Sequence, residues 1–227
     1  MNYKLRRLVP NSISSLSLVL GVLSIFMSIE KDFFHAALFI VLAMIADSLD
    51  GRAARFLGVA GGRFGIEMDS LCDLASFGVA PAIMIYQYGM TELGMTGMVI
   101  SSFFTIGGAL RLARFNCNVD DVKGYFQGMP IPAGACCLAT YVLSGYQADA
   151  CYVAALTFGV AVIMYSEVKY PDFKGKGNPM FAVPCVVAAA IGAYMLWQTP
   201  SAWPFIAMFT YTIAGVINFF YALVMGK

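Results

Sequence analysis

Charged residues are scarce in this chain of 227 residues: Asp, Glu, Lys and Arg make up 12% of it, whereas 60% of the residues are hydrophobic. The mean hydropathy is +0.76. Because so few charges cannot cover the surface of a soluble globule, the composition excludes that class and predicts an integral membrane protein. Low-complexity segments, long linkers and soluble domains are also lacking, so residues 1–227 are expected to form a single domain, without a nucleic acid partner.

Histidine and paired cysteines are equally scarce. The sequence holds one histidine, His35, and six cysteines without a CxxC spacing. Scattered cysteines in apolar segments are typical of small buried side chains and not of disulfides or metal ligands. His35 begins an apolar run, a position that favours the membrane interface over catalysis.

Long apolar runs are what the sequence does have. Runs able to cross ~30 Å of hydrocarbon as helices begin near residues 12, 33, 66, 94, 132, 150, 179 and 203. They predict an all-α, polytopic transmembrane bundle of about eight spans. The first run is interpreted as a retained helix, since no clear signal-peptide cleavage site ends it. A six-span core with a peripheral pair is the alternative, because residues 130–166 could form one re-entrant pair.

The basic residues orient this bundle. Eight spans place all 14 lysines and arginines except Lys31 in cytoplasmic segments, as the positive-inside rule requires. Both termini are therefore predicted to be cytoplasmic, and residues 47–73 to lie at the cytoplasmic ends of spans two and three.

Residues 47–73 concentrate acidic side chains at a membrane boundary. Asp47 and Asp50 are three residues apart, and Asp69 and Asp73 are four apart, so each pair shares one helix face. If the two helices are antiparallel neighbours, all four carboxylates converge. Clustered carboxylates repel one another unless cations or protons neutralise them. Oxygen ligands suit Mg²⁺ or Mn²⁺, and a pair of such ions is typical of phosphoryl transfer.

Small residues accompany these acids. Gly51 and Ala54 would let a base or ribose approach one helix, Gly65 does the same opposite, and Arg55 could meet phosphate. The alternative is that the acids pair with the three arginines of the stretch as a structural network, or line an ion path.

The complete spacing is Asp47-x2-Asp50-Gly51-x2-Ala54-Arg55-x9-Gly65-x3-Asp69-x3-Asp73. This stretch resembles the motif of the CDP-alcohol phosphotransferase family. The resemblance implies an enzyme that transfers a phosphatidyl or similar group from a CDP-linked donor to an acceptor hydroxyl and releases CMP. It further implies one metal ion on the first three aspartates, a second on the first, third and fourth, Asp73 as general base, and a homodimer.

The segment LVPNSIS, residues 8–14, has two interpretations. Pro10 could open a helix that Asn11 or Ser12 caps. The resemblance instead implies that Pro10 and Asn11 lie beside the nucleotide. Arg63 is a further candidate for the pyrophosphate of the CDP-linked lipid.

Two later segments bear on which acceptor the enzyme would use. RLARFN with FQGMPIPA, and YSEVKYPDFKGK, resemble the phosphatidylserine synthase branch, whose members are membrane-spanning CDP-diacylglycerol–serine O-phosphatidyltransferases. A serine carboxylate needs cationic or amide donors. The candidates are Arg111, Arg114, Asn116 and Lys169.

The resulting hypothesis is a phosphatidyl transfer from CDP-diacylglycerol to L-serine, with two Mg²⁺ or Mn²⁺ ions, at the cytoplasmic face of a prokaryotic inner or plasma membrane. Glycerol phosphate, inositol phosphate or choline are alternative acceptors. A divalent-cation carrier is the alternative outside enzymes, and it should show broken helices or inverted repeats.

Overall fold

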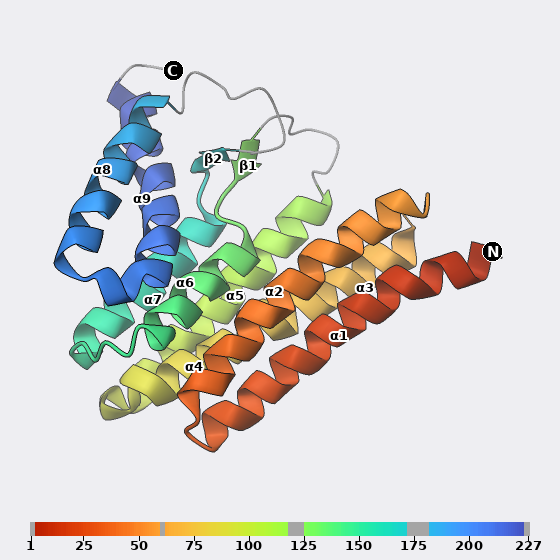
Figure 1. The fold of residues 1–227 in the computed structure, drawn as a ribbon, viewed down its shortest axis with the longest axis horizontal. Helices are drawn as coiled ribbons and strands as arrows, with labels where there is room; N and C mark the ends of the chain where they lie inside the picture. Colours follow the sequence, from red (N-terminus) through yellow and green to blue (C-terminus); the bar gives the residue numbers. More distant parts are fainter. Residues whose placement is uncertain (1–2, 60–61, 118–124, 172–181, 225–227) are drawn as a thin grey trace.

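The computed structural model describes residues 3–59, 62–117, 125–171 and 182–224, which are almost entirely helical (Figure 1). The α-helices are α1 (Tyr3–Ile29), α2 (Phe33–Phe56), α3 (Arg63–Asp73), α4 (Ala80–Gly89), α5 (Met95–Cys117), α6 (Ile131–Leu143), α7 (Ala150–Tyr165), α8 (Ala182–Gln198) and α9 (Trp203–Val224). A π-helical turn over Leu74–Val79 joins α3 to α4 without a break. Two short strands, β1 (Tyr125–Gln127) and β2 (Lys169–Pro171), pair antiparallel.

Five helical segments of the described chain are long and apolar enough to cross a membrane: Leu8–Ile29, Phe33–Phe56, Arg63–Gly89, Met95–Cys117 and Pro200–Tyr221. The helices α6, α7 and α8 are apolar but shorter. At 1.5 Å per residue, the 13 residues of α6 extend about 20 Å, less than the ~30 Å of hydrocarbon. The prediction of an all-helical membrane bundle is confirmed, and five crossings are supported by length.

One local expectation was wrong. Pro10 does not open the first helix but lies inside α1, which already begins at Tyr3. The residues before the proline, Leu5-Arg6-Arg7-Leu8, are good helix formers, so the helix extends upstream of the apolar span.

Helices α1 and α2 form a long antiparallel hairpin whose turn lies far from the N-terminus (Figure 1). Lys31 adopts a positive φ of 61° in this turn, and the Asp32 carboxylate caps α2 by accepting the His35 backbone N–H at 3.2 Å. The same carboxylate lies 2.7 Å from the His35 ring nitrogen Nδ1, a contact that lowers the Asp32 pKa below its ordinary value.

Glycines allow helices to touch closely, and two of these contacts involve backbone atoms of another element. A Cβ on Gly21 of α1 would lie 2.7 Å from the Cα of Ser76 in the π-helical turn. A Cβ on Gly107 of α5 would lie 2.7 Å from the carbonyl oxygen of Ala161 in α7. Real Cβ atoms do not approach other atoms so closely, so both contacts depend on glycine.

Helix α6 lies inside the bundle and packs against α2, α4 and α9. It is buried at Ile131 and at every residue from 134 to 142. A helix that is apolar all round is buried in this way, which explains why α6 lacks an amphipathic pattern.

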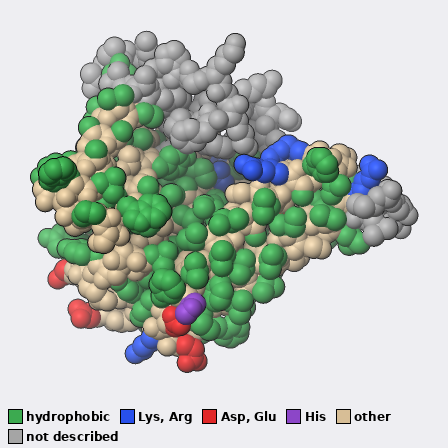
Figure 2. Space-filling view, in the orientation of Figure 1, with side chains coloured by type: hydrophobic (Ala, Val, Ile, Leu, Met, Phe, Trp, Pro, Cys, Tyr) green, Lys and Arg blue, Asp and Glu red, His purple; other side chains and the backbone are tan. Residues whose placement is uncertain are grey.

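The surface separates charge from apolar side chains. Figure 2 shows a broad apolar band, with the Asp and Glu side chains gathered at one end and most Lys and Arg side chains at the other. Exposed large hydrophobic side chains on this scale are what a lipid-facing surface requires.

Candidate active site

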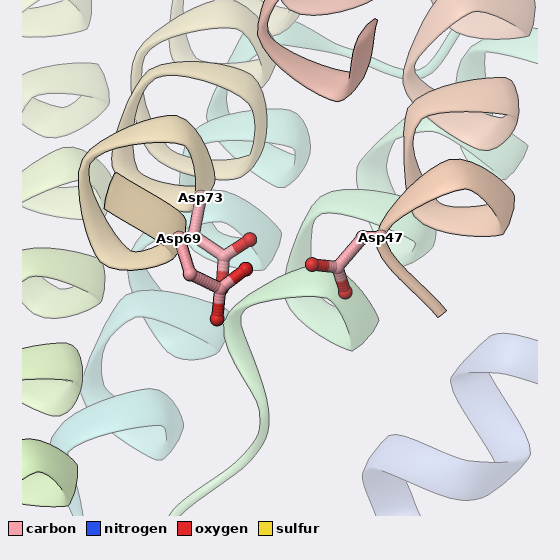
Figure 3. A group of neighbouring side chains, drawn as sticks. All are labelled: Asp47, Asp69 and Asp73. Atoms are coloured by element: carbon pink, nitrogen blue, oxygen red, sulfur yellow. The ribbon is translucent and has the colours of Figure 1, made fainter. Parts of the chain in front are cut away.

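Three carboxylates meet where α2 faces α3. Asp47 comes from α2, and Asp69 and Asp73 come from successive turns of α3 and point across towards it (Figure 3). One oxygen from each carboxylate lies within 4.8 Å of those from the other two. Asp73 is buried and the other two are partly buried. The spacing of four residues places Asp69 and Asp73 on one face, as the sequence predicted.

Asp50, the fourth aspartate, lies beside this group of three carboxylates. Its side chain is 7% exposed and interacts with the Asp69 carboxyl. The buried hydroxyl of Ser14 on α1 donates a hydrogen bond to Asp50 Oδ2 at 2.5 Å. The four aspartates therefore occupy one region, with three close together and Asp50 linking the group to α1.

Counter-charge near these aspartates is limited. Among the described residues, the only ion pair is that of Asp32 with His35. No Lys or Arg side chain there forms an ion pair with the four carboxylates. Arg52, Arg55 and Arg63 are exposed. These three arginines therefore do not form a structural network with the four aspartates. A concentration of carboxylate oxygens fits a hard divalent cation.

A single buried guanidinium of the described chain, that of Arg111, interacts with Asp47 and Asp73. Arg111 is 8% exposed, and its guanidinium carbon lies 5.2 Å from the centre of the Phe115 ring. Arg111 is therefore a buried cation whose charge acts on the aspartate group without forming an ion pair with it.

A pocket of about 210 Å³ opens beside Asp50 and Asp69, between α1, α2 and α3. Its walls include the candidates for CDP binding on all three helices. The lining residues are Pro10, Asn11, Ser14, Asp50, Gly51, Ala54, Arg55, Val59, Gly62, Phe64, Gly65, Ile66 and Asp69. Asp47 and Arg63, also proposed for the CDP-lipid, are not among them.

The pocket glycines have room around them. A Cβ on Gly51 would meet Arg55 Nη1 at 3.5 Å, and one on Gly65 would meet Asn11 Oδ1 at 3.7 Å. These are ordinary van der Waals distances. Helix packing therefore does not require glycine at either position, in contrast to Gly21 and Gly107.

The π-helical turn directly follows Asp73. Ser76 Oγ in this turn donates to the Ser17 carbonyl oxygen at 3.0 Å, and Thr105 Oγ1 on α5 donates to the Gly78 carbonyl oxygen at 3.1 Å. Turns of this kind recur at functional sites. Here the turn is fixed from both sides, so the end of α3 that carries Asp73 is held against α1 and α5.

Arg114, a candidate for the acceptor, is engaged elsewhere. Its Nη1 donates to the Tyr165 carbonyl oxygen at 2.8 Å, and its Nη2 donates to those of Gln127 and Ser166 at 3.1 and 3.0 Å. The guanidinium also lies 5.0 Å from the centre of the Tyr165 ring. Arg114 thus joins the ends of α5 and α7 to β1.

The last two acceptor candidates differ in what the structure describes. Asn116 Nδ2 donates to Ser70 Oγ of α3 at 2.8 Å. Asn116 therefore lies beside α3, at the residue that follows Asp69. Lys169 lies in β2, where it is the partner of Gln127, and its side chain is outside the described part of the structure.

Sequence reasoning missed Ser14 and the apolar lining of the pocket at Val59, Phe64 and Ile66. A signal for Ser14 exists, since it follows Pro10 by four residues and Asn11 by three and so shares their face of α1. The apolar residues gave none, because a membrane protein has such residues everywhere.

Fold and site together define a helical membrane protein with a carboxylate-rich centre beside a small pocket. Residues 7–166 match the model of the CDP-alcohol phosphatidyltransferase family, and the chain belongs to this family. It is therefore an enzyme, and the carrier hypothesis has no support.

Curated relatives cover most of the chain. It is 40% identical over 174 residues to the CDP-diacylglycerol–serine O-phosphatidyltransferase of Helicobacter pylori strain J99, covering 74% of this chain and 73% of the relative. It is 37% identical over 172 residues to the archaetidylserine synthase of Methanothermobacter thermautotrophicus, covering 74% and 72%. Identity to the Bacillus subtilis CDP-diacylglycerol–serine O-phosphatidyltransferase is 33% over 174 residues, covering 77% and 93%.

Proposed function

We propose that this enzyme transfers the phosphatidyl group of CDP-diacylglycerol to the hydroxyl of L-serine, giving phosphatidylserine and CMP. The observation that carries the proposal is the group of three aspartates beside a pocket lined by six of the residues expected around CDP. The names of the curated relatives, two serine transferases and an archaetidylserine synthase, support serine as acceptor.

The aspartates are proposed to hold two divalent cations, Mg²⁺ or Mn²⁺, one on Asp47, Asp50 and Asp69 and one on Asp47, Asp69 and Asp73. When bound, such ions would neutralise the pyrophosphate and hold the transferring phosphorus for in-line attack. Among the described residues no basic side chain forms an ion pair with the four carboxylates, and the single buried charge of Arg111 cannot balance them all, which leaves this role for cations from solution.

The pocket is proposed to receive the CDP group. Gly51 and Ala54 leave one wall without large side chains, so a base or ribose can lie against α2. Arg55 combines exposure with a place in the lining, which suits it to contact phosphate from the solvent side. Pro10, Asn11 and Gly65 complete the opposite wall.

Asp73 is proposed as the general base. It accepts the proton of the serine hydroxyl, whose oxygen then forms a bond to the lipid-side phosphorus. The bond from this phosphorus to the CMP oxygen breaks, and CMP leaves with the electron pair. Burial of Asp73 limits competition from water, which would hydrolyse the donor instead.

Arg111 is the proposed partner of the serine carboxylate. Its buried guanidinium interacts electrostatically with Asp73, the proposed base, which supports a place on the acceptor's side of the site. Asn116 remains a candidate beside it, and Lys169 a candidate from β2. Arg114 belongs to this set by sequence, but its three carbonyl partners favour a structural role.

We further propose that the enzyme is a homodimer with eight crossings, cytoplasmic termini and a cytoplasmic active site. Two native cysteines test the orientation, because both are exposed and they lie at opposite ends of the bundle: Cys117 at the end of α5 near Arg114, and Cys151 at the start of α7. In right-side-out spheroplasts, a membrane-impermeant maleimide should label Cys151 and spare Cys117. The reverse pattern would contradict the orientation.

The reaction is tested with purified enzyme in detergent, CDP-diacylglycerol and Mg²⁺ or Mn²⁺. Serine, glycerol 3-phosphate, inositol phosphate and choline are supplied separately, and CMP and the lipid product are identified by mass. Of the four acceptors, only serine should support CMP release. A chelator should stop this release until metal is restored. CMP release with a different acceptor would show that serine is not the substrate. If no acceptor supports CMP release, the proposed transfer reaction is rejected.

A further inference from the structure

Ser14 provides a buried contact to an aspartate from a different helix. Its side chain is 6% exposed, it lines the pocket, and its hydroxyl lies 2.5 Å from Asp50 Oδ2. The two residues are 36 positions apart, so only the packing of α1 against α2 brings them together. The bond therefore links α1, which carries none of the four aspartates, to the carboxylate group.

The serine hydroxyl has one proton and two acceptors within reach. Asp50 Oδ2 is at 2.5 Å, and the carbonyl oxygen of Pro10 is at 3.2 Å. A charged acceptor at the shorter distance forms the stronger bond. The proton is therefore directed at Asp50, where it restrains rotation of the carboxylate about its terminal torsion.

The neighbouring serine does not share this contact. Ser15 Oγ donates to the Asn11 carbonyl oxygen at 2.7 Å within α1 and touches no carboxylate. Ser14 and Ser15 thus differ in one respect that matters here, which makes Ser15 a matched control.

We propose that Ser14 is a positioning residue, which orients the Asp50 carboxylate for binding of a divalent cation. This inference rests on the proposed function, since it assumes that Asp50 is a metal ligand. Partners of metal ligands restrict the orientations that the ligand can adopt, and their removal commonly lowers metal affinity by about 10- to 100-fold.

The test compares Ser14→Ala, Ser14→Thr and Ser15→Ala with the unchanged enzyme in detergent. Mn²⁺ binding is measured by calorimetry without substrate, and turnover is then measured against Mn²⁺ concentration. Ser14→Ala should weaken Mn²⁺ binding about tenfold or more. Ser14→Thr, which keeps the hydroxyl, should restore most of the affinity, and Ser15→Ala should leave it unchanged.

The outcomes separate this inference from the proposed function. If the unchanged enzyme binds Mn²⁺ and Ser14→Ala binds it equally well, the positioning role is refuted while the metal site stands. If the unchanged enzyme binds no Mn²⁺, both fall. A raised KM for CDP-diacylglycerol at saturating Mn²⁺, with unaltered Mn²⁺ affinity, would place Ser14 against substrate and also refute the role. Should Ser14→Ala fail to fold, Ser14→Cys replaces it, because the thiol is similar in size but a weak donor.

Discussion

Replacement of Gly51 by alanine should stabilise the protein and impair its reaction at the same time. Gly51 lies in the interior of α2, where glycine costs roughly 0.5–1 kcal/mol relative to alanine. The new Cβ would meet only an ordinary contact, Arg55 Nη1 at 3.5 Å. The free energy of unfolding should therefore rise by up to about 1 kcal/mol, which corresponds to a rise in Tm of roughly 2–4 °C.

The cost should appear in catalysis, because the methyl group adds to the wall of the pocket. If CDP lies against this wall, the steric penalty is comparable to overpacking a core, about 1–3 kcal/mol, or about 5- to 150-fold in kcat/KM. Thermal unfolding in detergent and CMP release against CDP-diacylglycerol concentration measure the two effects.

Gly107→Ala is the matched control, since it makes the same change inside α5. There the Cβ would lie 2.7 Å from the Ala161 carbonyl oxygen, so Tm should fall. The reasoning is refuted if Gly51→Ala lowers Tm, which would make the glycine a packing requirement, or if it leaves kcat/KM unchanged, which would remove substrate from this wall.

Three further predictions concern charged residues. Asp73→Asn should abolish CMP release while CDP-diacylglycerol still binds in equilibrium measurements, because the amide cannot accept the hydroxyl proton; retained turnover would reject the base assignment. Arg111→Lys should raise the KM for serine about tenfold with little change in Tm, since a point charge replaces a fork of donors. Arg114→Lys should instead lower the free energy of unfolding by about 1–3 kcal/mol, because three carbonyl oxygens lose their donors. If Arg114→Lys raised the KM for serine and Arg111→Lys lowered the stability, Arg114 would be the serine ligand and Arg111 the structural residue.

The sequence by itself determined the class of protein and the chemistry of its centre. Apolar runs must become helices in lipid, because backbone groups there have no water to bond. The helical periodicity then placed Asp69 and Asp73 on one face, and Asp47 and Asp50 on another. The same periodicity placed the small residues Gly51 and Ala54, three positions apart, on one helix face, which forms a wall of the pocket.

Tertiary structure decided which of these residues act on one another. The bond from Ser14 to Asp50 and the electrostatic interaction of Arg111 with Asp73 connect helices that are distant in sequence. Arg111 and Arg114 lie three residues apart and look equivalent in the sequence. Yet Arg111 is buried and its charge acts on the aspartates, whereas Arg114 donates to carbonyl oxygens of β1 and α7. Periodicity fixes the face of a helix on which a side chain lies, but the partner opposite that face is set by the packing of whole helices.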